Sequence, residues 1–246
     1  MNVKMPVNTG NLKPREIHDK AGNLQVMAYG TPNSMATMYM LNSRLVGNRI
    51  LQIKSLEQGK DFSPNLGGWL METYPGISRL SFGSNAEGYD YVTVTVRAPG
   101  EWAKDNMRAN LEQSLIGVAA HMSKYTLPQL FALEKMPQAR SLHEYFHGYA
   151  NAGCTKWEAQ HRAVIALANN KLAHDGGEVH FAGYDDASQT MKVWLDGNCS
   201  DCKSSSMTVE TNILNYFKMN PGKFERHVEK MQVVQQQPPI VTPVFA

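Results

Sequence analysis

Alternating apolar and polar residues outline a strand that leads into the most informative stretch of the chain. Met191, Val193 and Leu195 fall on one face of this expected strand, and Lys192 and Trp194 fall on the other. Such alternation is typical of a half-buried strand. Further on, apolar residues recur at helical spacing, at Val209, Ile213, Leu214 and Phe217. The pattern predicts a strand, a tight turn and a helix in succession.

The first half of the chain carries a second set of apolar patterns. The clearest predicted strand is at residues 91–96, where three valines alternate with tyrosine and threonine. Another strand, at 77–82, precedes it, and the glycine-containing loop between them indicates a hairpin. The other predicted elements are a strand at 49–54, a helix at 63–73 and a helix at 102–120. Together they indicate an α+β domain over residues 31–122.

Three segments show no sustained apolar period. Residues 1–30 are predicted to be an extended arm, residues 123–156 a long, partly helical linker, and residues 235–246 a flexible tail rich in proline and glutamine. The fold class expected from the whole chain is therefore α+β. It consists of two small α/β-sandwich-type domains, 31–122 and 157–234, joined by the linker and flanked by extended arms.

Two cysteines occupy the predicted turn between strand and helix. Cys199 and Cys202 are separated by two residues, and a helix N-terminus close by favours thiolates. A dithiol redox centre, half of a zinc site and half of an iron–sulfur site all fit this spacing. Zinc and four-iron clusters normally take four protein ligands, and the only other cysteine is Cys154. Either the site is completed in a dimer, or it is not a metal site.

The flanks of the cysteine pair are more specific than the pair itself. They read Leu172-Ala173-His174-Asp175-Gly176-Gly177-Glu178-Val179 and then Leu195-Asp196-Gly197-Asn198-Cys199-Ser200-Asp201-Cys202-Lys203-Ser204-Ser205-Ser206-Met207-Thr208. An Asp-Gly-Gly turn, a hairpin, a C-x-x-C loop, serines and Met-Thr follow one another between two helices. In this order the residues resemble the C-terminal domain of the Nfu/NifU-like iron–sulfur proteins.

The first domain adds to that resemblance through weaker motifs. They are Thr31-Pro32-Asn33, Ser63-Pro64, Gly76-Ile77, Phe82-Gly83, the strand at 91–96, and Trp102. In order and followed by the cysteine domain, they resemble the N-terminal domain of Nfu-type proteins.

The resemblance implies an iron–sulfur cluster scaffold or carrier rather than an enzyme. A 4Fe-4S cluster would be held by Cys199 and Cys202 and shared between two copies of the chain, as a cluster-bridged homodimer or higher homo-oligomer. Zinc is an alternative occupant, because four thiolates suit both metals. The implied partners are acceptor apo-proteins that receive the cluster.

Two other functions stay open. A structural or interaction protein that keeps the NifU-like fold and cluster within a larger assembly, such as a virion, would account for the additional arm, linker and tail. A zinc metalloprotease would use the H-E-x-x-H motif of His143, Glu144 and His147, with Glu158 or His161 as a third ligand.

Composition limits the remaining classes. The 246 residues are 42% apolar with a formal charge of +2, and the charge forms no basic stripe of the kind that binds nucleic acid. No apolar run is long enough for a membrane span. Three cysteines exclude a disulfide framework and fit a reducing compartment. We expect a cytoplasmic protein that binds neither nucleic acid nor membrane, or a virion-associated one if the structural alternative holds.

Overall fold

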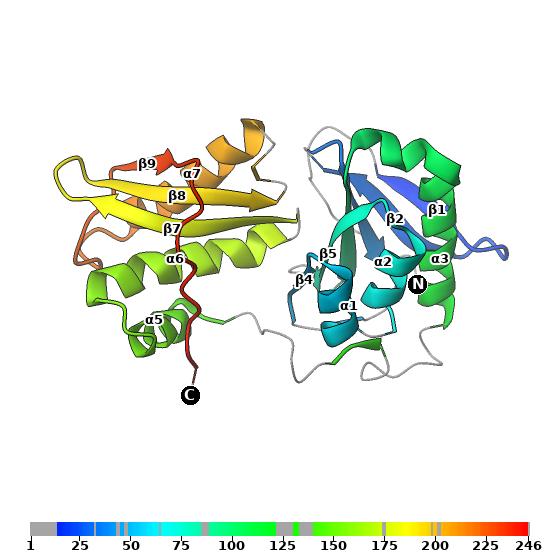
Figure 1. Cartoon of the computed structure of the whole chain (residues 1–246), viewed down its shortest axis with the longest axis horizontal. Coiled ribbons are helices and arrows are strands. Elements are labelled where there is room, and N and C mark those ends of the chain that lie inside the picture. The colour runs from blue at the N-terminus through cyan, green and yellow to red at the C-terminus, as the bar shows by residue number, and fades with distance from the viewer. Residues whose placement is uncertain are drawn as a thin grey trace. The chain divides into compact units, whose positions relative to one another are not determined.

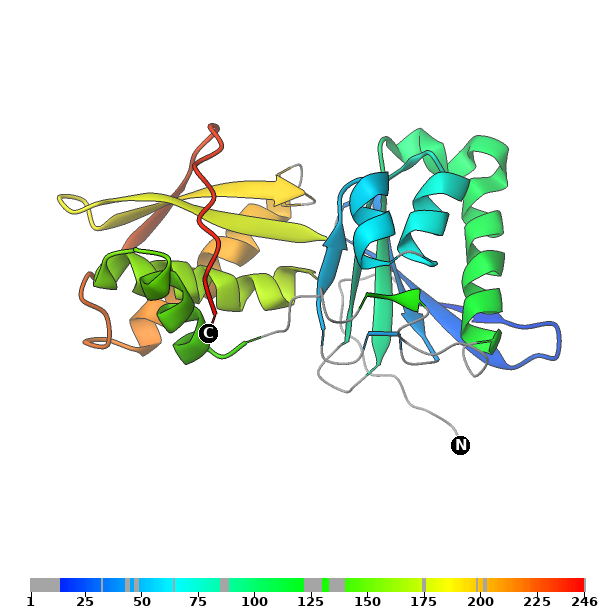
Figure 2. The ribbon, with the colours of Figure 1, turned by 60° about the horizontal axis from the view of Figure 1, so that its bottom comes forward.

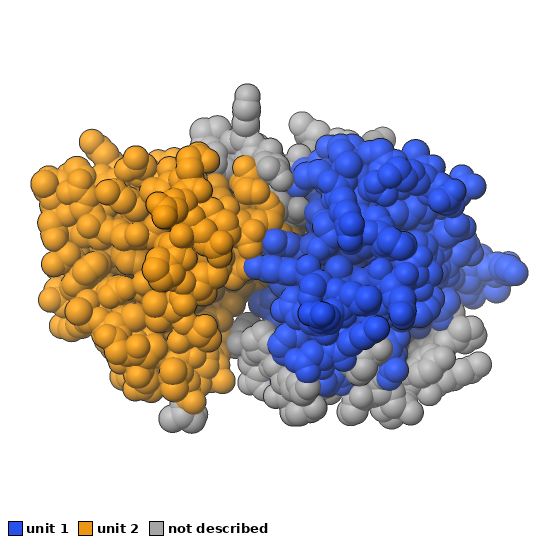
Figure 3. Space-filling model, viewed as in Figure 1, with its two compact units in different colours: residues 1–137 blue, residues 138–246 orange. Residues whose placement is uncertain are grey.

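The structure is a computed structural model of the whole chain. It describes residues 14–31, 33–42, 45–46, 49–63, 65–84, 89–121, 130–132, 140–173, 176–197, 199–200 and 203–245, of which 24, 120, 121, 171 and 203–208 are described by backbone alone. The chain divides into two compact units, residues 1–137 and 138–246 (Figure 3).

The first unit is built on a six-stranded antiparallel sheet of order β1-β2-β3-β6-β5-β4. Its strands are β1 (Arg15–His18), β2 (Leu24–Gly30), β3 (Ala36–Leu41), β4 (Leu51–Ile53), β5 (Ile77–Ser84) and β6 (Asp90–Val96). The predicted hairpin is confirmed, since β5 pairs with β6 from Ile77↔Val96 to Ser84↔Asp90.

The helices of the first unit cover one face of this sheet (Figures 1 and 2). They are α1 (Leu56–Phe62), α2 (Gly67–Thr73), the 3-10 helix η1 (Pro99–Asn106) and α3 (Met107–His121). Of the helix predicted at 63–73, the structure has α2, which begins at Gly67, and α1 before it was not predicted. Ser63 ends α1, and its hydroxyl accepts the N–H of Gly67 at the start of α2. The opposite face carries a separate buried cluster of Met27, Tyr29, Met38, Met40 and Tyr91.

The expectation of an extended arm over residues 1–30 was wrong for its second half. Residues 15–30 form β1 and β2, and β2 is buried on both faces. The guanidinium of Arg15 also makes two hydrogen bonds to the carboxylate of Glu112 on α3. Residues 26–29 of β2 are an unbroken apolar run, which lacks the alternation by which a strand is recognised in sequence.

The predicted linker, residues 123–156, is shorter in the structure than expected. Leu130 and Phe131 are buried in the core of the first unit, where the Phe131 and Phe82 rings meet edge to face at 5.3 Å. Further along, α5 (Leu142–Asn151) packs against α6 (Lys156–Leu172) of the second unit. Parts of the linker therefore belong to each unit, and residues 122–129 and 133–139 lie outside the described residues.

The second unit contains a three-stranded sheet with α6 and α7 (Lys203–Met219) on one face (Figure 1). The hairpin of β7 (Gly177–Asp185) and β8 (Thr190–Gly197) is antiparallel, and β9 (Lys230–Val233) adds to β8 in parallel. The α+β prediction is confirmed for the chain. Among the described residues, no helix has the length and apolar character needed to cross a bilayer.

The tail predicted to be flexible, residues 235–246, instead folds back along the second unit. The N–H of Val244 donates to the carbonyl of Gly148 on α5 at 2.9 Å, and Asn151 donates to the Val244 carbonyl at 3.2 Å. The Phe245 ring lies under the Arg140 guanidinium, 3.8 Å from its carbon. Proline and glutamine prevent this segment from forming a core of its own but do not prevent it from docking on one.

Candidate functional site

The β7–β8 hairpin positions the first cysteine of the C-x-x-C loop. Val179 and Leu195 are cross-strand partners with buried side chains, and two pairs further along Gly177 faces Gly197. Cys199 stands two residues after Gly197 and is 3% exposed, within the core formed by the hairpin and the two helices. The thiol is therefore held on the helix-facing side of the hairpin.

A glycine makes room for this thiol. A β-carbon added at Gly177 would overlap the Cys199 sulfur and would lie 3.3 Å from the Cys199 β-carbon. The second glycine of the Asp-Gly-Gly turn is therefore required for steric reasons. Only a residue without a side chain lets β7 begin this close to the cysteine.

The loop leaves β8 through a tight turn. Gly197 has a φ of 62°, a left-handed conformation that glycine adopts readily. The N–H and the hydroxyl of Ser200 both donate to the Gly197 carbonyl, at 3.0 and 2.7 Å. Helix α7 then begins at Lys203. Cys199 consequently lies between a strand end and a helix N-terminus, as the sequence predicts.

Cys202, the second predicted ligand, lies outside the described residues, as do Asn198 and Asp201. The pairing of Cys199 with Cys202 at one metal therefore stays a prediction.

The comparisons with known proteins agree with this geometry. Residues 162–226 match the NifU-like domain family. That part of the chain is similar to the NifU-like domain. The match extends from α6 through the hairpin and the cysteine loop to the segment after α7. The predicted resemblance to the Nfu/NifU-like family is thereby confirmed.

One similar protein is the NifU-like protein 4, mitochondrial, of Arabidopsis thaliana, which is 27% identical over 145 residues. The alignment covers 57% of this chain and 44% of the relative, so less than half of the relative's length is represented. No solved structure matches the chain. The matched domain and the relative both carry the NifU-like description. The relative is named as a mitochondrial protein, and the cytoplasmic location of this chain stays a prediction.

Cys154 lies at the far end of α6 from the cysteine loop that follows β8. It precedes α6 by two residues, whereas Gly177, which contacts Cys199, follows the end of that helix. A 17-residue helix spans roughly 25 Å. Burial raises the pKa of the Cys154 thiol. Within one chain this cysteine is too remote to be a ligand together with Cys199.

The H-E-x-x-H motif lies on α5, outside the residues matched to the NifU-like domain. The rings of His143 and His147 are 4.3 Å apart, one turn along the helix. Glu144, however, closes a capping box: its carboxylate accepts the N–H and hydroxyl of Ser141 at 2.9 and 2.8 Å. These hydrogen bonds lower the pKa of Glu144, and the bond from the Ser141 backbone N–H has the larger effect. The glutamate therefore stabilises the start of α5.

The two expected third ligands of a protease site have other contacts. His161 is fully buried among aromatic rings, with Nε2 3.0 Å from the Arg226 carbonyl, and burial lowers its pKa. Glu158 accepts two hydrogen bonds from Arg162. Over the described part of the chain, no third histidine, cysteine or carboxylate joins His143 and His147 in a metal-sized group.

A different group of potential metal ligands occurs on the β7–β8 hairpin. Ligand atoms of Glu178, His180 and Asp196 all lie within 4.8 Å of one another, the single such group among the described residues. The sequence interpretation missed it, because these residues stand apart along the chain. Once the hairpin register is known, the i, i+2 spacing of Glu178 and His180 and the pairing of Glu178 with Asp196 identify it.

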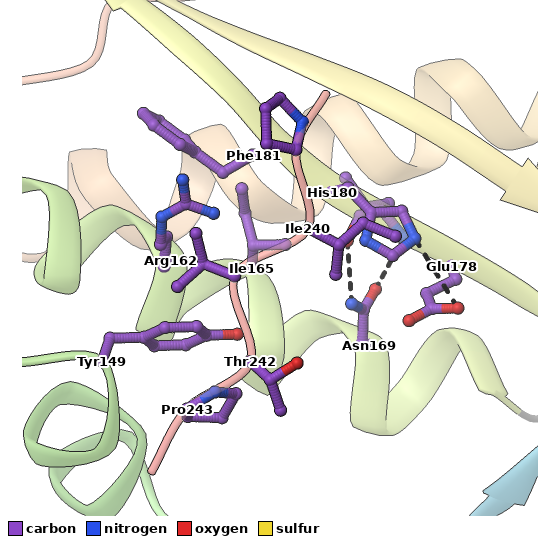
Figure 4. Close-up of a pocket in the computed structure, with 13 residues that line it drawn as sticks. Tyr149, Arg162, Ile165, Asn169, Glu178, His180, Phe181, Ile240, Thr242 and Pro243 are labelled. Carbon is purple, nitrogen blue, oxygen red and sulfur yellow. Dashed lines mark hydrogen bonds and ion pairs between the residues drawn. The ribbon is translucent and has the colours of Figure 1, made fainter. Parts of the chain in front are cut away.

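A cavity of about 190 Å³ lies beside this group, between α5, α6, β7 and the tail (Figure 4). Asn169 of α6 forms one wall: its amide bonds both the N–H and the carbonyl of Val179, at 2.9 Å each. Ile240, Thr242 and Pro243 of the tail form another. The edge of β7 is thus held by α6 and covered by the tail.

Proposed function

We propose that this chain is an iron–sulfur cluster scaffold or carrier that binds a 4Fe-4S cluster through Cys199 and Cys202. The observation that carries the proposal is the placement of Cys199, packed against Gly177 at the strand-to-helix turn of a NifU-like domain. Thiolates are the usual ligands of such clusters.

Two cysteines supply half of the ligands that a four-iron cluster needs. We propose that a second copy of the chain supplies the other half, so that the cluster bridges two subunits. Separation of the copies would open the coordination shell, which suits a protein that assembles a cluster and passes it to acceptor apo-proteins. We infer no catalytic role, since Glu144 of the H-E-x-x-H motif is engaged in the capping box.

Anaerobic reconstitution with iron and sulfide analysis tests the proposal. We expect about four irons and four sulfides per two chains in the wild type, and loss of both in Cys199→Ser and in Cys202→Ser. Cys154→Ser is the matched control and should retain the full content. Content unchanged in both loop variants, or lost equally in Cys154→Ser, would contradict the assignment.

A structural or interaction protein that retains its cluster is the second candidate. It is favoured by the elements outside the match, because α5, β9 and the docked tail enlarge the NifU-like domain on several sides. The two candidates differ in the fate of the cluster. A carrier loses it to an excess of apo-acceptor, whereas a structural protein keeps it under the same conditions.

A further inference from the structure

The outer face of the β7–β8 hairpin carries three ligand-type side chains that the cysteine site does not use. Along β7, buried Gly177, Val179 and Phe181 alternate with half-buried Glu178 and His180. Because successive side chains of a strand point to opposite faces, Glu178 and His180 share the outer face. The register then pairs Glu178 with Asp196 and His180 with Trp194, so these four side chains are neighbours on the outer face.

The contacts of His180 point to a ligand. Its Nε2 is inaccessible to solvent and has no hydrogen-bond partner among the described residues. The nearest carboxylate oxygen, Oε2 of Glu178, is 3.6 Å away, too far for a hydrogen bond. Buried polar nitrogens normally have a partner, and a metal ion is one. The Trp194 ring lies 5.3 Å from the imidazole and restricts its orientation.

We propose that Glu178, His180 and Asp196 bind one divalent transition-metal ion, of the Mn²⁺, Fe²⁺ or Zn²⁺ class. Two carboxylates and a neutral imidazole match a divalent charge and the ligand preferences of these ions. Metal–ligand bonds of about 2.1 Å bring neighbouring ligand atoms to roughly 3–3.5 Å, so the 4.8 Å group needs small side-chain rotations to close. Three protein ligands leave positions for water, and the bound ion is exchangeable.

This site is separate from the cysteine site. The β-carbon direction of Gly177 is toward the Cys199 sulfur on the inner face, whereas the three ligands occupy the outer face of the same two strands. The cavity beside Glu178 and His180, next to Ile240 of the tail, gives space on that side for the ion's water ligands (Figure 4). The metal site does not depend on the proposed cluster.

Titration of the cluster-free, full-length protein with Mn²⁺, with free Mn²⁺ counted by electron paramagnetic resonance, tests the site. Mn²⁺ prefers oxygen and nitrogen ligands, so the thiols compete little. We expect one saturable Mn²⁺ per chain, and affinity at least tenfold weaker in His180→Ala and in the isosteric Glu178→Gln and Asp196→Asn. The double variants Cys199→Ser/Cys202→Ser and His143→Ala/His147→Ala are the controls and should bind as the wild type does.

Absence of saturable binding would overturn the proposal. So would a loss of binding in either control combined with unchanged binding in all three ligand variants. The two amide variants preserve side-chain shape, so a folding defect of His180→Ala cannot hide the answer. Failure of the cluster proposal would show in the cysteine variants of the earlier experiment and leave this titration unchanged.

Discussion

Gly177→Ala is the perturbation that tests how closely Cys199 is held by the hairpin. The new methyl group would occupy the place of the Cys199 sulfur and stand 3.4 Å from the Cys199 backbone nitrogen. Cys199 is 3% exposed, so the sulfur cannot move without displacing core residues. Overpacking of this kind costs about 1–3 kcal/mol. At a urea slope of about 1–3 kcal/mol per molar, the unfolding midpoint should fall by roughly 1 M.

A double-mutant cycle separates this contact from a general effect of alanine in a strand. In a Cys199→Ala background the sulfur is absent, and we expect Gly177→Ala to cost about 1 kcal/mol less than in the wild type. The assay is urea unfolding of cluster-free protein. The same destabilisation in both backgrounds would refute the contact.

Gly117 of α3 provides a control in the first unit. A β-carbon there meets nothing within 4 Å, so Gly117→Ala should stabilise by about 0.5–1 kcal/mol through helix propensity. In cluster reconstitution, Gly177→Ala should lower the iron content, whereas Gly117→Ala should leave it unchanged.

Three further changes probe the second unit. Burial lowers the pKa of His161, so as pH falls below about 6.5 the unfolded state takes up the proton first and stability declines. His161→Phe should flatten that part of a urea-midpoint profile between about pH 5 and 8, and an unaltered profile would exclude His161 as its source. Phe245→Ala removes the ring beneath Arg140 and should make the tail more sensitive to limited proteolysis; equal cleavage rates would contradict tail docking. Ser141→Ala opens the capping box of α5 and should cost about 0.5–2 kcal/mol in thermal unfolding, whereas Ser141→Asp should cost less.

The sequence predicted best those elements whose pattern is local. The β5–β6 hairpin and β8 alternate between apolar and polar residues, and α6 and α7 carry apolar residues at helical spacing. By contrast, β2 is buried on both faces and has no alternation to detect. The short strand β9, Lys-Met-Gln-Val, is mostly exposed and is a strand because it pairs with β8. Such pairing between distant segments cannot be read from either segment alone.

The sites show the same contrast between local patterns, which the sequence reveals, and contacts between distant segments, which it does not. The cysteine loop was predictable because its turn, strand and helix signals lie within a few residues of Cys199 and Cys202. The group of Glu178, His180 and Asp196 depends on the hairpin register, and the docking of Phe245 on Arg140 joins residues 105 positions apart in the chain. The H-E-x-x-H motif was misleading although it is local. It lies on a helix as expected, but Glu144 forms the capping box with Ser141.

Native mass spectrometry of anaerobically purified protein can test whether a cluster bridges two chains, because it reports subunit number and cluster content together. We expect a species of twice the 27.5 kDa chain mass carrying one four-iron, four-sulfide cluster. Cys199→Ser/Cys202→Ser should yield the chain without iron or sulfide. A monomer that carries zinc alone, or a cluster retained in the double variant, would contradict a cluster bridged by the two cysteine loops.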